Sequence, residues 1–267
     1  MFEPLRKIFR ARPETPRPSV PEGERIYVVG DVHGRIDLFQ ALIDAIESDD
    51  REAASATTTI VLLGDLVDRG PDSAGVVAQA RALQARRRVR ILAGNHEEMF
   101  LQSFDERSIL RHFLKHGGRE TLFSYGISRD AFNESTLDEL QHLLREAVPQ
   151  ADRDFLNGFE EFVIAGDYLF VHAGILPEVP LEEQSRHDML WIRDRFLRHS
   201  AQHSHVVVHG HTICEQVDER ANRIGIDTGA YRTGKLTALV LEGETRRYIQ
   251  AAEDSGTITI RKMETAQ

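Results

Sequence analysis

The sequence predicts an α/β fold. Short apolar segments of strand length alternate with amphipathic helical segments in the first hundred residues, a pattern typical of parallel sheets buried between helices. The chain has 267 residues, of which 41% are hydrophobic and 28% are charged, as is ordinary for one large globular domain or two small ones. Glycine and a polar residue follow several of the predicted strands, and these positions are the candidate functional site.

Residues 1–23 are predicted to be a flexible leader. Proline is frequent there, at Pro13, Pro16, Pro18 and Pro21 among others, which favours an extended chain. The segment 1–12 is basic and lacks the apolar stretch of a signal peptide, so weak docking to a partner or membrane surface is the alternative. The lone Cys214 cannot form an internal disulfide, and we expect a cytoplasmic protein.

From residue 24 to residue 267 we expect a single domain. Its first half is predicted to contain strands at 26–29, 59–63 and 89–93, with helices at 36–46 and 71–86. Helical periodicity then continues from about 98 to 160, which predicts a helical insert beside the sheet. Short strands return in the second half, at 162–165, 168–171, 206–208, 224–226, 236–241 and 247–249.

Five of these strands end in residues that commonly bind metals. Because the carboxyl ends of parallel strands meet at one edge of a sheet, the side chains after them can gather around one point. One such motif alone would be read as a turn or a buried core histidine; five in one chain indicate a site. The candidate ligands are Asp31, His33, Asp65, Asn95, His172 and His211.

This ligand set is too large for one ion. Carboxylate, amide and imidazole groups suit Mn²⁺, Fe or Zn²⁺ better than a thiolate-preferring metal, and we expect two divalent ions, with Mn²⁺ favoured. A separation of about 3.5–4 Å would let them hold both the attacking and the leaving oxygen. Asp65 is the natural bridge, because a carboxylate has two oxygens.

The motifs GDVHG, GDLVDRG, GNHE, VHAG and HGHT resemble the PPP group of metallophosphoesterases, in the order in which they occur there. The resemblance spans nearly the whole folded chain. The segments GNHEEM, HFLKHGG and LWIR are most similar to bacterial and bacteriophage lambda-type serine/threonine protein phosphatases. The resemblance implies the calcineurin-like fold, a four-layer α/β/β/α sandwich.

The resemblance also implies a role for each site residue. Asp31, His33 and Asp65 would hold the first metal; Asp65, Asn95, His172 and His211 would hold the second. His96 would be the general acid, with Asp68 as its partner. Arg69, Arg193 and Asn95 would bind the substrate phosphate, with Arg195 as the alternative to Arg193.

The implied reaction is direct hydrolysis of a phosphomonoester by a metal-bridging hydroxide. The expected substrate is a phosphorylated protein, as for a serine/threonine or dual-specificity phosphatase, or a small phosphoester. The alternative is a symmetrical diadenosine tetraphosphatase, because the stretches HAGI and IDTGAYRTGKLTALVLEG resemble that sister group. Those enzymes usually lack the residues seen here as Asp68 and Glu97, and an aromatic content of 7% does not suggest a base-stacking pocket.

Other function classes fit less well. A net charge of −10 disfavours a nucleic-acid partner, which would need a basic surface. A catalytically silent phosphate-binding scaffold would have lost metal ligands or His96, and none is lost. His199, His203 and His205 could form a separate zinc site, but a surface helix leading into a strand explains their spacing.

Overall fold

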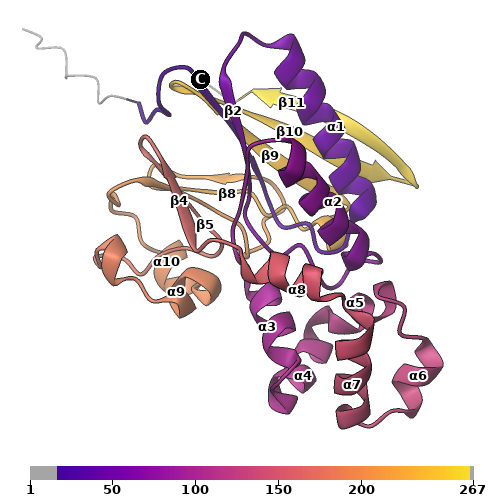
Figure 1. The fold of residues 1–267 in the computed structure, drawn as a ribbon. Helices are drawn as coiled ribbons and strands as arrows, with labels where there is room; N and C mark the ends of the chain where they lie inside the picture. Colours follow the sequence, from indigo (N-terminus) through magenta and orange to yellow (C-terminus); the bar gives the residue numbers. More distant parts are fainter. Residues whose placement is uncertain (1–16, 265–267) are drawn as a thin grey trace, which may run out of the picture.

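The computed structural model describes residues 17–264, which form two sheets (Figure 1). The first sheet has six strands in the order β11-β10-β9-β1-β2-β3. Its strands are β1 (Glu24–Val29), β2 (Thr57–Leu62), β3 (Val89–Ile91), β9 (Lys235–Glu242), β10 (Thr245–Asp254) and β11 (Thr257–Glu264). The neighbours β1, β2 and β3 are parallel, as predicted, while β9 to β11 form an antiparallel meander joined to β1.

The second sheet has five strands in the order β4-β5-β6-β8-β7. They are β4 (Phe162–Ala165), β5 (Tyr168–Val171), β6 (Val206–His209), β7 (Asp218–Glu219) and β8 (Arg223–Gly225). The central strands β5, β6 and β8 are parallel. Their carboxyl ends can therefore present side chains at one edge of this sheet as well.

The two sheets pack face to face, because alternate residues of each strand point to opposite faces. Tyr27 and Val29 of β1 lie in the cluster that includes α1 (Ile36–Glu52) and α2 (Ser73–Arg86). Ile26 and Val28 lie instead among Phe170 and other residues of the second sheet. On that sheet's outer side, α9 (Arg186–Trp191) and α10 (Asp194–Leu197) complete the four predicted layers.

A group of helices projects from one end of these layers (Figure 1), close to the predicted range of the insert. It has its own apolar core around Phe100 and Phe113. The elements are α3 (Asn95–Ser103), α4 (Arg107–Phe113), the kinked turn η1 (Leu114–Gly118), α5 (Arg119–Ser124), α6 (Arg129–Glu134), α7 (Leu137–Ala147) and α8 (Gln150–Asn157).

Residues 17–23 rest on the domain. Val20 is buried, and its N–H donates to the carbonyl oxygen of Gly243 at 3.1 Å. The Ser19 N–H donates to Asp167 at 2.9 Å. The rest of the predicted leader, residues 1–16, lies outside the described residues.

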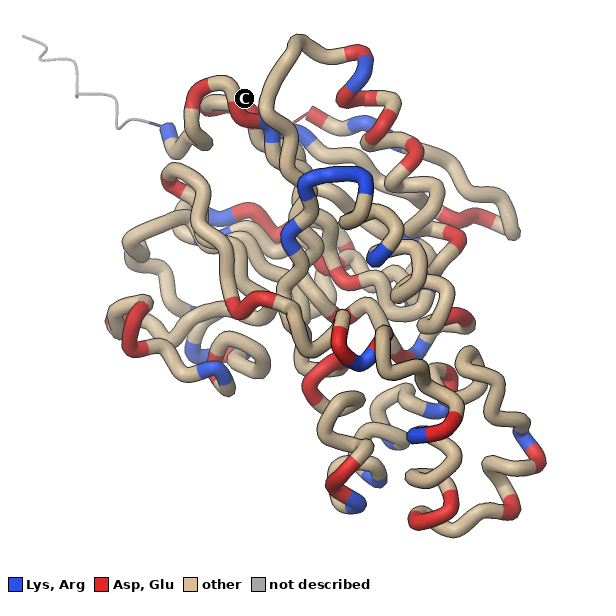
Figure 2. The backbone as a smooth tube through the Cα atoms, viewed as in Figure 1, with Lys and Arg blue, Asp and Glu red and all other residues tan. Residues whose placement is uncertain are grey.

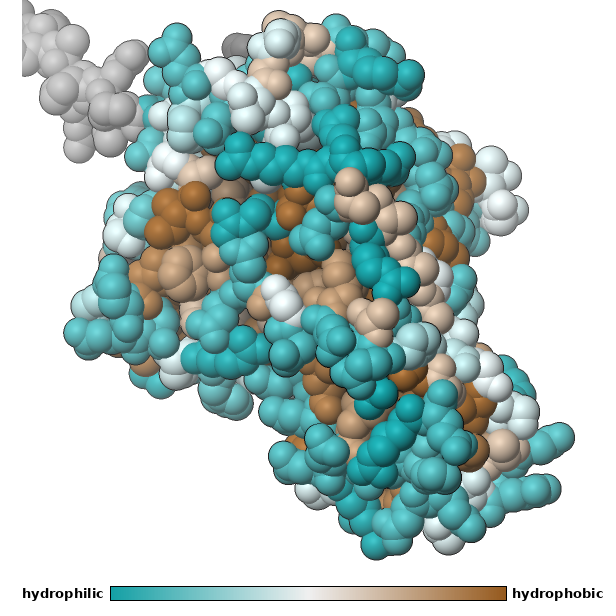
Figure 3. Space-filling view, viewed as in Figure 1, coloured by the Kyte–Doolittle hydropathy of each residue, from teal (hydrophilic) through white to brown (hydrophobic). Residues whose placement is uncertain are grey.

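The surface is mixed in charge and mostly polar. Acidic and basic residues alternate over the layers and the helical insert (Figure 2). The face seen in Figure 3 is largely hydrophilic, with apolar residues showing mainly near its middle and between insert helices. None of the helices within residues 17–264 combines the length and apolar character needed to cross a membrane.

The carboxylate of Asp49 ties α1 to the first sheet. It accepts hydrogen bonds from the Tyr27 hydroxyl at 2.7 Å and from Arg247 at 2.6 and 3.0 Å, and Lys262 lies 3.0 Å away. Burial opposes ionisation of Asp49, but the hydrogen bonds from Arg247 and Tyr27 outweigh it and lower its pKa to about 2. The ionised carboxylate should therefore stabilise the fold.

We expect Asp49→Asn to lower the free energy of unfolding at pH 7 by about 2 kcal/mol, the scale of charged hydrogen bonds. A carboxyl whose pKa falls on folding stabilises above its unfolded pKa of about 4. This contribution is lost as the pH falls through the folded value of about 2, so the difference from the native protein should shrink between pH 4 and pH 2. Urea unfolding measures it, with the exposed Asp44→Asn on the same helix as control; equal effects of both changes would contradict the assignment.

Candidate metal centre and active site

The predicted site residues lie together where strands of both sheets end. Asp31 and His33 follow β1, Asp65 follows β2, and Asn95 begins α3 just after β3. The second sheet contributes His172 after β5 and His211 after β6. The parallel order of each set of strands brings their carboxyl ends to the same side, so residues up to 180 positions apart meet in one place.

The backbone at this site is unusual. Seven non-glycine residues among those described have positive φ, and five of them belong to the site. Such conformations cost free energy and cluster at functional sites, where surrounding contacts maintain them. The five are His33 (φ 46°), Asp65 (φ 50°), Asp68 (φ 75°), Arg69 (φ 71°) and His211 (φ 61°).

Glycine is required at two points where backbone approaches a ligand. A Cβ atom on Gly94 would lie 2.1 Å from Asp65 Oδ1, and one on Gly210 would lie 2.0 Å from Asp31 Oδ1. Real Cβ atoms do not come so close to another atom. Glycine is therefore needed at these two motif positions, because any side chain there would collide with a predicted ligand.

Two groups of ligand atoms share Asp65. On one side, Asp65 Oδ2 lies 3.5 Å from His33 Nε2 and 4.0 Å from His96 Nε2. On the other side, Asp65 Oδ1 lies 3.5 Å from His172 Nε2. Each group could hold a metal ion, and the two oxygens of Asp65 face different groups, as expected for a bridging carboxylate.

Asn95 lies at the centre of the second group. Its Oδ1 is 3.0 Å from His172 Nε2 and 2.8 Å from His211 Nδ1. His172 Nδ1 lies 2.8 Å from the Leu63 carbonyl oxygen, which can only accept, so Nδ1 carries the proton. The lone pair of His172 Nε2 then faces Asn95 Oδ1, which is also an acceptor. A cation bound between these two atoms would remove the repulsion.

His33 has the same tautomer. Its Nδ1 lies 2.9 Å from the Val67 carbonyl oxygen, which leaves the Nε2 lone pair available beside Asp65, where it accepts from Arg69. Metal-binding histidines usually donate the other ring N–H in this way, to a carbonyl or carboxylate. Asp31 accepts from the His211 N–H at 3.0 Å through Oδ2, while Oδ1 of Asp31 and Nε2 of His211 are buried without a hydrogen-bond partner. The donor set therefore fits divalent cations.

The pKa values of the two predicted carboxylate ligands, Asp65 and Asp31, shift in opposite directions. Burial would raise the pKa of Asp65, but the charges of His172, His96 and His33 together lower it. Burial does raise the pKa of Asp31, and the nearby Asp227 and Asp65 carboxylates add to the effect. Burial also lowers the pKa values of His33 and His172. The cluster therefore crowds buried carboxylates and imidazoles together, and bound cations would offset the repulsion between the carboxylates.

His96 and Asp68 form a buried pair beside the first group. His96 Nδ1 lies 2.5 Å from Asp68 Oδ2, and both side chains are buried. Burial alone would lower the pKa of His96, but the Asp65 and Asp68 carboxylates raise it. The two carboxylates thus stabilise an added proton on the imidazole, as a general acid needs, and Nε2 is directed toward the ligand cluster, where it accepts from Arg69 in this structure.

Two arginines act on different parts of the cluster. Arg69 Nη1 is 2.7 Å from His33 Nε2, and its Nη2 is 2.8 Å from His96 Nε2. The charge of Arg193 lowers the pKa values of His172 and His211, after the larger effect of burial. Arg193 therefore lies near enough to the second ligand group to act on it electrostatically, and the choice between Arg193 and Arg195 as phosphate ligand stays a prediction.

Two buried carboxylates, Glu97 and Asp227, were given no role at the site by the sequence analysis. Glu97 accepts hydrogen bonds from the backbone N–H groups of Gly94, Asp65, Leu66 and Val67 at 3.0, 2.9, 2.7 and 3.2 Å, so it holds the loop that carries Asp65. Asp227 accepts from the Gly229 N–H at 2.9 Å, and burial raises its pKa to about 6. Its position directly after a predicted strand was the available signal.

Two aromatic rings flank the ligand cluster. The Tyr231 ring lies edge-on to His33, with centroids 5.2 Å apart, and the Arg69 guanidinium sits over it at 4.8 Å. On the other side, the Trp191 ring lies edge-on to His211 at 6.3 Å, and its N–H donates to Glu98 at 3.2 Å. Both side chains are half-buried, so their remaining surface can contact a ligand.

The other histidines do not form a second metal site. His199 and His203 stack at 5.0 Å, while His205 pairs with Ser204, and the metal-compatible groups in the described chain all include Asp65. His209 packs against Phe196 at 5.1 Å, and burial lowers its pKa to about 4. It is a core residue beside the site.

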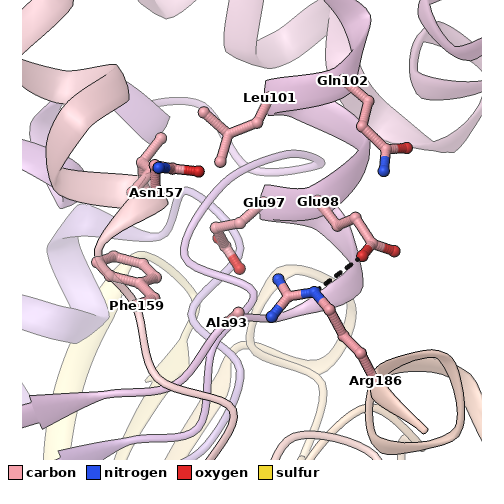
Figure 4. A pocket seen from close by; sticks show the side chains of 9 residues that line it. Ala93, Glu97, Glu98, Leu101, Gln102, Asn157, Phe159 and Arg186 are labelled. Atoms are coloured by element: carbon pink, nitrogen blue, oxygen red, sulfur yellow. Dashed lines mark hydrogen bonds and ion pairs between the residues drawn. The ribbon is translucent and has the colours of Figure 1, made fainter.

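A pocket of about 300 Å³ lies between α3, the end of α8 and Arg186 (Figure 4). Leu101, Gln102 and Phe159 line it, and Arg186 pairs with Glu98 at its edge. Glu97 is its only contact with the loop of Asp65. None of the predicted ligands lines this pocket, so it is not the candidate active site.

Comparison with known proteins agrees with this geometry. The family model described as "Calcineurin-like phosphoesterase" matches residues 24–227. A symmetrical bis(5'-nucleosyl)-tetraphosphatase of Acidovorax sp. (strain JS42) is 35% identical over 160 residues, which cover 59% of this chain and 47% of that protein. The chain thus spans about half the length of such tetraphosphatases.

Two further proteins are similar over more of their length. Serine/threonine-protein phosphatase 1 of Salmonella typhimurium is 27% identical over 218 residues, which cover 79% of this chain and 89% of that protein. A solved structure, provisionally named a diadenosine tetraphosphatase, superposes with a TM-score of 0.59 at 19% identity, covering 94% of this chain and 100% of the other. At that identity the superposition shows a shared fold only.

Proposed function

Because the chain belongs to the calcineurin-like phosphoesterase family, we propose that it is a metal-dependent phosphohydrolase acting on dinucleoside tetraphosphates. Hydrolysis of a phosphoprotein monoester is the second candidate. The observation that carries the first choice is the pair of rings, Tyr231 beside His33 and Trp191 beside His211. A symmetrical dinucleotide has a base at each end, and this site has an aromatic side chain on each side.

The similar proteins also support the tetraphosphate as first candidate and the phosphoprotein as second. Symmetrical tetraphosphatases reach 35% identity, against 27% for the serine/threonine phosphatase. The low aromatic content of the chain is no obstacle, because two rings placed at the site are sufficient. Base stacking on an aromatic side chain contributes about 1–3 kcal/mol per base, enough to affect the choice of substrate.

Each residue has a role in this proposal. Asp31, His33, Asp65, Asn95, His172 and His211 would hold two divalent cations, with Mn²⁺ our first choice. When bound, such cations lower the pKa of water and neutralise charge on the transferring phosphoryl group. Arg69 and Arg193 would bind phosphate oxygens, and His96 would deliver a proton to the leaving oxygen.

The second candidate has its own support. The short contact between His96 and Asp68 would hold a proton donor in place, which an alkoxide leaving group needs more than a nucleotide does. The match to the Salmonella phosphatase also extends over 89% of that protein. A phosphoserine or phosphothreonine peptide is therefore the appropriate competitor substrate.

The test compares the two substrates on one preparation. The Mn²⁺-loaded protein should hydrolyse diadenosine tetraphosphate with a higher kcat/KM than phosphoserine, phosphothreonine or phosphotyrosine peptides, and should release ADP only. Tyr231→Leu and Trp191→Leu should each lower that kcat/KM by about tenfold. Both should change hydrolysis of inorganic tripolyphosphate, which has no bases, much less.

A reversed preference would move the assignment to the protein phosphatase. Equal losses on tripolyphosphate would show that the two rings do not stack on bases. A protein that hydrolyses none of these substrates with Mn²⁺, Fe²⁺ or Zn²⁺ would be a phosphate-binding scaffold instead.

A further inference from the structure

The helical insert reaches the active site through Thr121 on α5. This side chain is fully buried, and its hydroxyl donates to Asp68 Oδ1 at 2.6 Å while accepting from the Asp68 N–H at 3.0 Å. Ser73 Oγ lies 3.0 Å from Thr121 Oγ1. Since the threonine proton goes to Asp68, the serine hydroxyl must be the donor in this contact. The Thr121 hydroxyl thus donates one hydrogen bond and accepts two, which fixes its orientation.

Asp68 is held at both oxygens. Oδ1 accepts from Thr121, and Oδ2 contacts His96 Nδ1 at 2.5 Å. The carboxylate is buried, and its backbone is in the left-handed region, at φ 75°. Among the described residues, Thr121 is the only hydrogen-bond partner of Oδ1, so its hydroxyl decides how the carboxylate is rotated.

The helical insert also holds Arg69, the residue that follows Asp68. The Gly117 carbonyl oxygen of η1 accepts from the Arg69 N–H at 3.0 Å. Gly117 has φ 109°, and a Cβ there would lie 2.6 Å from Arg69 Cγ. Two consecutive left-handed residues, Asp68 and Arg69, therefore depend on contacts from the insert. The backbone of η1 is kinked at His116 and Gly117, where it leaves helical geometry.

We propose that Thr121 is a positioning residue for leaving-group protonation, an inference that rests on the proposed phosphohydrolase function. It acts through Asp68: its hydroxyl fixes the rotation of the carboxylate, and the carboxylate in turn aims the imidazole of His96 at the leaving oxygen. Without the hydroxyl, Asp68 Oδ1 would be buried with no donor, and the carboxylate could turn away from His96.

The test uses phosphate esters whose leaving groups need different amounts of protonation. In the metal-loaded enzyme, Thr121→Val should lower kcat for an alkyl phosphate by about 10- to 100-fold. It should lower kcat for nitrophenyl phosphate by less than about threefold, because that leaving group departs without a proton. Thr121→Ser keeps the hydroxyl and should restore both rates. Should Thr121→Val fold poorly, the smaller Thr121→Ala provides the same comparison.

Ser124→Ala is the matched control. Ser124 accepts from the Ala74 N–H at 3.1 Å, so its loss loosens the same helix without touching Asp68, and it should affect both esters alike. Metal content, measured by mass spectrometry, should stay unchanged in every variant. Equal losses on all esters in Thr121→Val, or failure of serine to rescue, would overturn the positioning role alone. A native protein inactive on diadenosine tetraphosphate as well as on every ester would instead overturn the proposed function on which it rests.

Discussion

Asp65→Asn is expected to remove both metal ions and to lower hydrolysis by about 10³-fold or more. The reason is that one oxygen of Asp65 faces each ligand group, with His33 Nε2 and His172 Nε2 both 3.5 Å away. Asparagine keeps the shape but offers one oxygen and no charge. No other carboxylate among the described residues occurs in both groups.

Metal content and activity should be measured on the same samples. Chelation should abolish hydrolysis by the native protein, and Mn²⁺ should restore it. Asp152→Asn is the control, because Asp152 is also buried and paired, with Arg81 at 2.7 Å, but lies in the helical insert. A chelated Asp65→Asn protein with full activity, or one that loses a single ion, would rule out the shared carboxylate.

His96→Asn is expected to slow hydrolysis of alkyl phosphates by about 10²- to 10⁴-fold. An alkoxide leaves only when it is protonated, and His96 is the buried imidazole that Asp68 holds at 2.5 Å. The loss on nitrophenyl phosphate should be much smaller. Initial rates on both esters, taken at saturating substrate, give the comparison.

The same variant tests whether His96 is also a metal ligand. His96 Nε2 is 4.0 Å from Asp65 Oδ2 and falls within the first ligand group. If it is only an acid, the His96→Asn protein should keep both ions. His209→Asn serves as the control for loss of a buried imidazole. Equal losses on both esters, or loss of an ion, would show that His96 acts by holding metal or phosphate.

The strand ends, and the candidate ligands that follow them, could be located from the sequence because both are local features. Each parallel strand is a short apolar run, and the glycine and ligand that follow it are adjacent in the chain. The second sheet was predicted only as a set of strands. Strand β11 went unpredicted, since Ile260 is exposed and an edge strand with one open face lacks the apolar run of a buried one.

The supporting contacts could not be predicted, because they join distant segments. Thr121 lies 53 positions from Asp68, and no periodicity in either segment indicates that they meet. The aromatic content of 7% did not suggest a base-stacking pocket. Composition cannot show where the rings lie, and Tyr231 and Trp191 lie beside the predicted ligands. The two rings and the relatives are therefore the grounds for proposing a dinucleoside tetraphosphate rather than the phosphoprotein expected from the sequence.

The pairing of β1 with β9 has a consequence for synthesis in the cell. Arg25 is opposite Glu242, so more than 200 residues separate two neighbouring strands. Contacts of such sequence separation form slowly and late. During translation β1 is exposed along one edge until β9 leaves the ribosome, and His172 and His211 also emerge after the first four ligands. We therefore expect the nascent chain to need protection from aggregation and to become competent for catalysis only when nearly the whole chain has been released.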